Sequence, residues 1–152
     1  MLYSKSSEYA IQAMLHLAEH HESDLGMVST IAEACNIPRQ FLAKLVQTLA
    51  RRRLIESFRG RKGGIRLARS PESITLLEIV NAIEGPPQEK EKCVIGLDVC
   101  SEDAICPLHI EWMNTRNLIR DTLEHQTLAS MVAGLPAKRE ELAQQLHESG
   151  SE

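Results

Sequence analysis

Residues 31–68 read IAEACNIPRQFLAKLVQTLARRRLIESFRGRKGGIRLA, and they hold the clearest structural signal in the chain. Pro38 suits the first position of a helix, where its missing N–H is not needed. A shorter helix precedes it, and the hydroxyl of Ser29 or Thr30 could cap that helix. The apolar residues of the second helix recur at helical spacing and are Phe41, Leu42, Leu45, Val46 and Leu49. Two short helices joined by a tight turn predict a helix-turn-helix.

Two short apolar segments follow these helices and flank a basic, glycine-rich tip. The segments are Leu54–Phe58 and Ile65–Leu67, and the tip reads RGRKGG at residues 59–64. This pattern predicts a two-stranded β-hairpin. A hairpin directly after a recognition helix is a wing, and its cations would contact phosphates or enter the minor groove of DNA.

The net charge of −4 conceals a strongly basic segment. Residues 39–69 contain ten Lys or Arg and one acidic residue, Glu56, whereas residues 71–152 contain six basic and fifteen acidic residues. Such a patch on a helix-turn-helix predicts double-stranded DNA as the partner, because cations supply sequence-independent affinity and amide side chains can bind adenine. The candidate DNA-contacting residues are Arg39, Gln40, Lys44, Gln47, Arg51, Arg59, Arg61, Lys62 and Arg66.

Further helix signals lie on both sides of this segment. The serines near the start of the chain can cap a first helix that ends near His20. Thr75 and Glu78 have the spacing of a capping box, and Gly85 followed by two prolines ends the helix that the box opens. Residues 1–85 are therefore expected to form one winged helix-turn-helix domain.

The last third of the chain predicts a long helix that begins after Cys106 and Pro107. A helix of roughly 18 residues would be about 27 Å long, too long for the preceding small domain to bury, so we expect a dimerisation helix. Thr127 would cap a short turn that ends at Gly134, and Pro136 would begin a final helix. The expected fold is mainly α with a small β-hairpin wing, a cysteine-rich segment at 86–106, and dimerisation and C-terminal helices at 107–152.

Residues 92–109 read KCVIGLDVCSEDAICPLH and gather three cysteines and a histidine: Cys93, Cys100, Cys106 and His109. Three thiolates and an imidazole can hold a soft metal centre. Tetrahedral zinc accepts this donor set, but structural zinc loops usually offer a close C-x2-C pair. The spacing C-x6-C-x5-C-x2-H suits a wider iron–sulfur cluster better. Free thiols are the third alternative, and the acidic residues around the cysteines disfavour a bare reactive thiolate.

The chain resembles the Rrf-two family of iron–sulfur transcription regulators, of the IscR and NsrR types. The resemblance rests on KSSEYAIQAMLHLA (5–18), the helix-turn-helix, RGRKGGIRLA (59–68), TLLEIVNAIEG (75–85), the three cysteines, CPLH (106–109) and TLASMV (127–132). It implies a homodimeric winged-helix regulator in which an iron–sulfur cluster near the dimer interface alters the affinity for DNA. The expected role is transcription regulation, with repression as the default, and not catalysis.

The resemblance also implies two alternatives for the fourth cluster ligand. The CPLH segment is similar to the branch in which a histidine, here His109, completes a 2Fe-2S cluster. Glu8 is similar to the acidic residue with which the nitric-oxide-sensing branch completes a 4Fe-4S cluster from the partner subunit. We favour His109 and a 2Fe-2S cluster.

Composition narrows the remaining possibilities. Aromatic residues make up 3% of the chain, which disfavours recognition of single-stranded nucleic acid by base stacking. No stretch approaches the roughly 20 apolar residues that cross a bilayer, and the start does not resemble a signal peptide, so we expect a cytoplasmic protein. Cys35 is expected in the core. Five histidines show no partner cysteines or ligand spacing: His16, His20, His21, His125 and His147. The competing hypothesis is a zinc-stabilised or thiol-based DNA-binding or interaction protein without a cluster.

Overall fold

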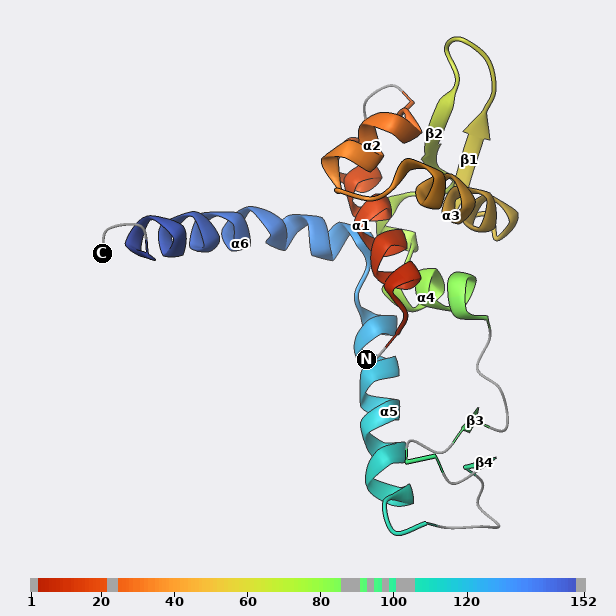
Figure 1. Ribbon diagram of the computed structural model, residues 1–152, viewed down its shortest axis with the longest axis vertical. Coiled ribbons are helices and arrows are strands. Elements are labelled where there is room, and N and C mark those ends of the chain that lie inside the picture. The colour runs from red at the N-terminus through yellow and green to blue at the C-terminus, as the bar shows by residue number, and fades with distance from the viewer. Residues whose placement is uncertain are drawn as a thin grey trace.

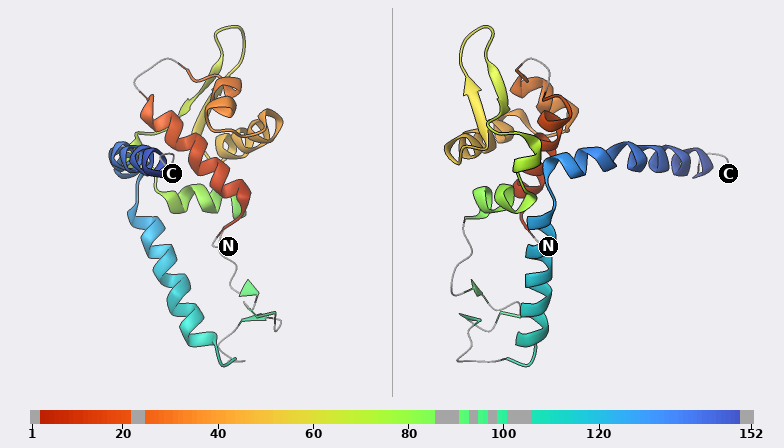
Figure 2. Two further views of the ribbon diagram at one scale, coloured as in Figure 1. Left: turned by 60° about the vertical axis from the view of Figure 1, so that its left-hand side comes forward. Right: turned by 180° about the vertical axis from the view of Figure 1, so that it is seen from behind.

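The computed structural model describes residues 3–21, 25–85, 91–92, 95–96, 99–100 and 106–149 (Figure 1). In chain order the elements are α1 (Lys5–Glu19), α2 (Val28–Ala34), α3 (Arg39–Arg51), β1 (Ile55–Phe58), β2 (Gly64–Leu67), the 3-10 helix η1 (Pro71–Ser73), α4 (Leu76–Glu84), β3 (Glu91–Lys92), β4 (Val99–Cys100), α5 (His109–His125) and α6 (Leu128–Ser149). They form a winged helix-turn-helix from which α5 and α6 project as two arms (Figures 1 and 2). The predicted mainly α fold with a hairpin wing is confirmed.

One apolar core holds the winged helix-turn-helix together. Within it, α1 packs against α3 and α4, and α2 packs against α3. The largest fully buried apolar side chains are Met14, Ile31, Leu42, Leu49, Ile65, Ile74, Ile79 and Leu128. Each contributes about 1.5–3 kcal/mol by leaving water. These side chains come from α1, α2, α3, β2, α4 and α6 and, for Ile74, from the segment between η1 and α4, so the core joins the start of the C-terminal arm to the domain.

The helix-turn-helix differs from the prediction at two positions. The first is the start of α2, where Met27 is the N-cap with no side-chain hydrogen bond and Ser29 lies inside the helix. The chain enters α2 from Gly26, which is paired with Ile65 of the wing, so the helix begins earlier than its hydroxyl residues indicate. The second is Phe41, which is 37% exposed.

The wing is an antiparallel pair in which Phe58 lies opposite Gly64. Gly26 anchors it to the domain, because the backbone N–H and C=O of Gly26 each bond to Ile65 at 2.9 Å. Glycine is needed at position 64, where a Cβ would lie 2.8 Å from the carbonyl oxygen of Gly26. A larger residue would therefore push the wing away from this anchor.

Hydrogen bonds at helix ends join α1 to α4. A carboxylate oxygen of Glu84, at the end of α4, accepts bonds from the Ser4 backbone N–H at 3.0 Å and from the hydroxyls of Ser4 and Ser7 at 2.5 Å. Partial burial raises the pKa of Glu84, but these hydrogen bonds outweigh it and leave the pKa below its ordinary value. The start of α4 has the predicted capping box at Thr75, and Gly85 ends the helix with φ of 91°.

The α5 arm leaves the domain with most of its surface uncovered. His109 is the buried residue of α5, at the end of the helix that lies farthest from the domain (Figures 1 and 2). Large apolar side chains stay exposed along this arm, with Ile110 at 62% and Leu118 at 67%. At its other end α5 packs against α4.

The α6 arm is one continuous helix, so the predicted break between Gly134 and Pro136 is wrong. Pro136 has no N–H to donate to the Val132 carbonyl, so the helix lacks one backbone hydrogen bond there but continues to Ser149. The Thr127 hydroxyl does cap the start of α6, accepting from the Ser130 N–H at 3.1 Å. None of the helices in the described ranges combines the length and the apolar character needed to cross a bilayer.

Candidate DNA-binding surface and cysteine site

The polar side of α3 faces solvent. Every candidate DNA-contacting residue of this helix is exposed, namely Arg39, Gln40, Lys44, Gln47 and Arg51. The opposite side of α3 lies in the core through Leu42, Leu45 and Leu49. The β1–β2 hairpin stands beside α3, at the end of the molecule opposite the α5 arm (Figure 1). This arrangement presents a helix and a basic hairpin together, as a winged helix does when it binds duplex DNA.

The wing cations fall into two groups. Arg59, Arg61 and Lys62 at the tip are exposed, and in the part of the chain that the structure describes no carboxylate pairs with them. Arg66 is different, because its guanidinium pairs with Glu56 across the hairpin at 2.7 Å and lies 5.0 Å from the centre of the Phe58 ring. The tip therefore presents positive charge without compensation, whereas the charge of Arg66 is partly neutralised.

Most of the cysteine segment lies outside the described residues, Cys93 included. The backbone of residues 91–92 pairs with residues 99–100 as β3 and β4, with Glu91 opposite Cys100 and Lys92 opposite Val99. Cys93 follows Lys92 directly in the sequence. The pairing thus brings the backbone of residues 91–92 beside that of residues 99–100, which include the second cysteine.

Cys106 and His109 lie together at the start of α5. The His109 backbone N–H donates to the Cys106 carbonyl at 3.0 Å, which fixes the turn between them. Cys106 is half-buried, and His109 is 9% exposed on a helix whose other residues are half-buried or exposed. One turn later the indole Nε1–H of Trp112 is buried with no acceptor among the described residues. A buried imidazole, a nearby thiol and a donor that needs an acceptor fit a group made of iron and sulfide.

Glu8 lies in the first turn of α1, where its carboxylate pairs with Lys5 at 2.7 Å and is 40% exposed. Within one chain, and among the side chains that the structure describes, Glu8 is not brought together with Cys106 and His109.

Cys35 lies at the end of α2, half-buried against the core, with its Sγ 3.8 Å from the Gln12 carbonyl oxygen. Burial raises the pKa of this thiol, with a smaller contribution from Glu19. The thiol therefore stays protonated, as expected of a small core residue.

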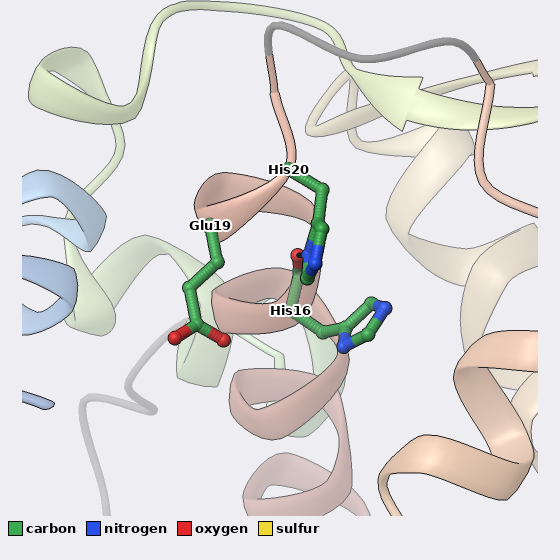
Figure 3. Close-up of side chains that lie close together, drawn as sticks. All are labelled: His16, Glu19 and His20. Atoms are coloured by element: carbon green, nitrogen blue, oxygen red, sulfur yellow. Dashed lines mark hydrogen bonds between the residues drawn. The ribbon is translucent and has the colours of Figure 1, made fainter. Parts of the chain in front are cut away.

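The sequence interpretation missed one cluster of candidate ligands. His16, Glu19 and His20 lie on the last turn of α1 and at its C-cap, and their ligand atoms all lie within 4.8 Å of one another (Figure 3). The available signal was the i, i+3, i+4 spacing, which puts three side chains on one helix face. The expectation that His16 and His20 lack ligand spacing is therefore wrong.

Comparison with known proteins gives one consistent result. The Rrf2 family model, described as an iron-dependent transcriptional regulator, matches residues 3–134. A protein of Aquifex aeolicus assigned as an HTH-type transcriptional regulator is 32% identical over 134 residues, which cover 87% of this chain and 92% of that protein. The HTH-type transcriptional regulator NsrR of Bacillus licheniformis is 26% identical, over 87% of this chain and 92% of the relative.

Two solved structures share the fold. The structure of T. potens IscR superposes with a TM-score of 0.71 at 26% identity, covering 87% of this chain and 86% of that one. The structure of CymR, the global cysteine regulator of B. subtilis, superposes with a TM-score of 0.72 at 27% identity, covering 86% and 95%. These relatives are regulators of transcription and not enzymes.

Proposed function

Because the chain belongs to the Rrf2 family of transcriptional regulators, we propose that it is a homodimeric DNA-binding repressor controlled by an iron–sulfur cluster. The observation that carries this proposal is the burial of His109 next to Cys106 at the start of α5, a helix whose other residues are half-buried or exposed. Ligation of a metal centre by His109 would account for this burial, and the neighbouring thiol of Cys106 supports that role.

DNA binding is assigned to α3 and the wing. Gln40 and Gln47 would reach base edges in the major groove, where an amide side chain can bind adenine through two hydrogen bonds. The cations of α3 and of the wing tip would neutralise phosphates and supply most of the salt-dependent affinity. Such a regulator acts on a chromosomal operator, so we propose that it works in the cytoplasm.

Dimerisation is assigned to the α5 arm. Its exposed apolar residues Ile110 and Leu118 need a partner to leave water, and a second copy of the same arm supplies a matching surface. A two-fold axis there would set two α3 helices on the two halves of a palindromic operator.

Cluster ligation is assigned to the thiolates of Cys93, Cys100 and Cys106, with His109 as the fourth ligand of a 2Fe-2S cluster. The β3–β4 pairing and the buried Trp112 donor support this set. Glu8 remains the alternative fourth ligand, of a 4Fe-4S cluster, and would come from the other subunit. Such a cluster supplies a centre that changes with iron supply, oxidation or nitric oxide.

Signal transfer is assigned to helix packing. Cys106 and His109 fix the first turn of α5, α5 packs against α4, and α4 packs against α3. A shift of the first turn of α5 would therefore be transmitted to the DNA-binding helix α3 through the α5–α4 and α4–α3 interfaces.

The test is anaerobic purification followed by assays of iron, acid-labile sulfide and zinc per subunit. We expect iron and sulfide in equal amounts, near two per subunit. His109→Ala should lower the retention of iron and sulfide, whereas the control His125→Ala, an exposed histidine at the other end of α5, should retain both. Equal retention in the two variants, with an iron count near four, would transfer the fourth-ligand role to Glu8.

A second candidate function is supported by the likeness to CymR, a cysteine regulator. In that case the chain is a DNA-binding regulator whose cysteines act as thiols or bind zinc. Colourless protein with one zinc per subunit, or with no metal after attempted reconstitution, would favour this candidate and overturn the cluster proposal.

A further inference from the structure

The end of α1 carries a side-chain cluster that the proposed function does not use. We propose that His16, Glu19 and His20 form a binding site for a divalent transition-metal ion of the Zn2+ type. Two imidazole nitrogens and one carboxylate oxygen are a donor set that Zn2+, Ni2+ and Cu2+ accept. This inference does not rest on the iron–sulfur proposal, because it shares no ligand with the cysteine site.

Geometry is the first argument. The ligand atoms lie within 4.8 Å of one another, and the two imidazole rings are 4.5 Å apart between centroids (Figure 3). Ligand atoms about 2.0–2.2 Å from a tetrahedral ion lie roughly 3.4 Å from one another. Side-chain rotations that move these atoms by about 1 Å would therefore complete the site. Histidines four residues apart on a helix face are a known zinc-binding arrangement.

Hydrogen bonding is the second argument. The Nδ1 of His20 lies 2.8 Å from the His16 carbonyl oxygen, and a carbonyl oxygen only accepts, so Nδ1 carries the proton. Nε2 is then the ring nitrogen with the lone pair. A metal-binding histidine commonly donates its other ring N–H in this way, and the bond holds both the tautomer and the ring orientation.

Electrostatics is the third argument. Partial burial lowers the pKa of His16, and His20 lowers it further against the opposing effect of Glu19. The cluster also lies at the C-terminal end of α1, where the helix dipole favours a cation.

The site lies next to the C-terminal arm. Nη2 of Arg139 on α6 donates to Oε2 of Glu19 at 3.1 Å and forms an ion pair with Oε1 at 2.9 Å. Glu19 and His20 also line an open cavity of about 660 Å³, whose other wall is formed by Ala129, Val132 and Ala133 of α6. An ion bound here would compete with Arg139 for the Glu19 carboxylate and would keep a coordination position toward the cavity. Occupancy would thus alter the contact between α1 and α6.

The test is a Zn2+ titration of the full chain by calorimetry, with the cysteines intact in every variant. We expect the double variant His16→Gln/His20→Gln to bind one equivalent less than the wild-type protein. His125→Gln is the matched control, because His125 makes the same Nδ1 contact to a carbonyl four residues earlier, at 2.7 Å, with no metal cluster around it among the described residues. Equal stoichiometry in the double variant and the wild type would overturn the site.

Two further measurements keep the proposal testable if the double variant does not fold. In the wild-type protein, Zn2+ should shift the imidazole nitrogen resonances of His16 and His20 but not those of His125, and unshifted resonances would overturn the proposal. Arg139→Gln removes the competitor for Glu19 and should tighten Zn2+ binding by up to about fivefold, the range of an exposed ion pair. Weaker binding in that variant would remove Glu19 from the ligand set.

Discussion

The winged domain and the α5 arm differ in how much of their apolar surface is buried. In the domain, α1 to α4 and the wing bury their apolar side chains against one another, so that Leu42 and Ile79 are fully buried. On α5, a helix of 17 residues, His109 is the buried residue and Leu118 is 67% exposed. The domain therefore buries its apolar surface through contacts within the chain, whereas the α5 arm leaves apolar surface that, in our proposal, a second chain covers.

The largest expected effect belongs to the domain core. Leu42→Ala should lower the free energy of unfolding by about 2–5 kcal/mol, because it leaves a cavity where the side chain is fully buried. Urea unfolding followed by circular dichroism measures the change. Leu118→Ala on the arm is the matched control, and at subunit concentrations too low for dimers it should change unfolding by less than about 0.5 kcal/mol. Equal losses in the two variants would contradict the distinction between core and arm.

The next largest effect concerns the arm. Leu118→Asp should weaken self-association by at least about tenfold, because a charge would enter the surface that a second copy covers. Sedimentation equilibrium measures the dissociation constant, and circular dichroism should show the domain still folded. If the variant stays dimeric at the wild-type affinity, the dimer interface lies elsewhere on the chain.

A smaller effect distinguishes two cations within the wing. Lys62→Ala should lower the slope of log K against log salt by about 1 and weaken binding to all DNA sequences alike, because an unpaired cation releases one counterion. Arg66→Ala should change the slope less, since Glu56 already neutralises Arg66 at 2.7 Å. Fluorescence anisotropy over a salt series measures both variants. A larger change for Arg66 would show that this ion pair opens when DNA binds.

The smallest effect concerns the tie between α1 and α4. Glu84→Gln should cost about 0.5 kcal/mol near neutral pH, an amount reduced by the exposure of the group. The lowered pKa of Glu84 means that its contribution is complete above the ordinary value of 4.5 and is lost as the pH falls through the folded-state value. Thermal melts between pH 3 and 7 should therefore converge for wild type and variant at the acid end. If the melting temperatures of the wild type and the variant differ by the same amount across this range, the charge of the Glu84 carboxylate does not cause the stabilisation.

Several elements could be predicted because their cause lies within a few residues. The Thr75 capping box, the helix stop at Gly85 and the basic hairpin tip each depend on neighbouring side chains and turn geometry, and each is present. The separation of buried and exposed faces on α3 follows from helical spacing in the same way. The assignment of Arg39, Gln47 and Lys62 to DNA, and of Cys93 and Cys100 to a metal, stays a prediction.

Other features depend on which distant segments meet. The Ser4 and Ser7 bonds to Glu84 join residues about eighty positions apart, and the Glu19–Arg139 pair joins residues 120 apart. The spacing of the basic residues cannot reveal that Glu56 pairs with Arg66 and with none of the tip cations.

Hydrophobic periodicity, caps and turns thus specify the order of the helices, the wing and the basic face, because these signals act over one or two helical turns. The burial of His109, the burial of the Trp112 indole N–H and the contact of α6 with the end of α1 arise only when the chain is folded. The physical reason is that burial and ion pairing depend on distances in space, which residues far apart in the sequence acquire through packing of the whole chain.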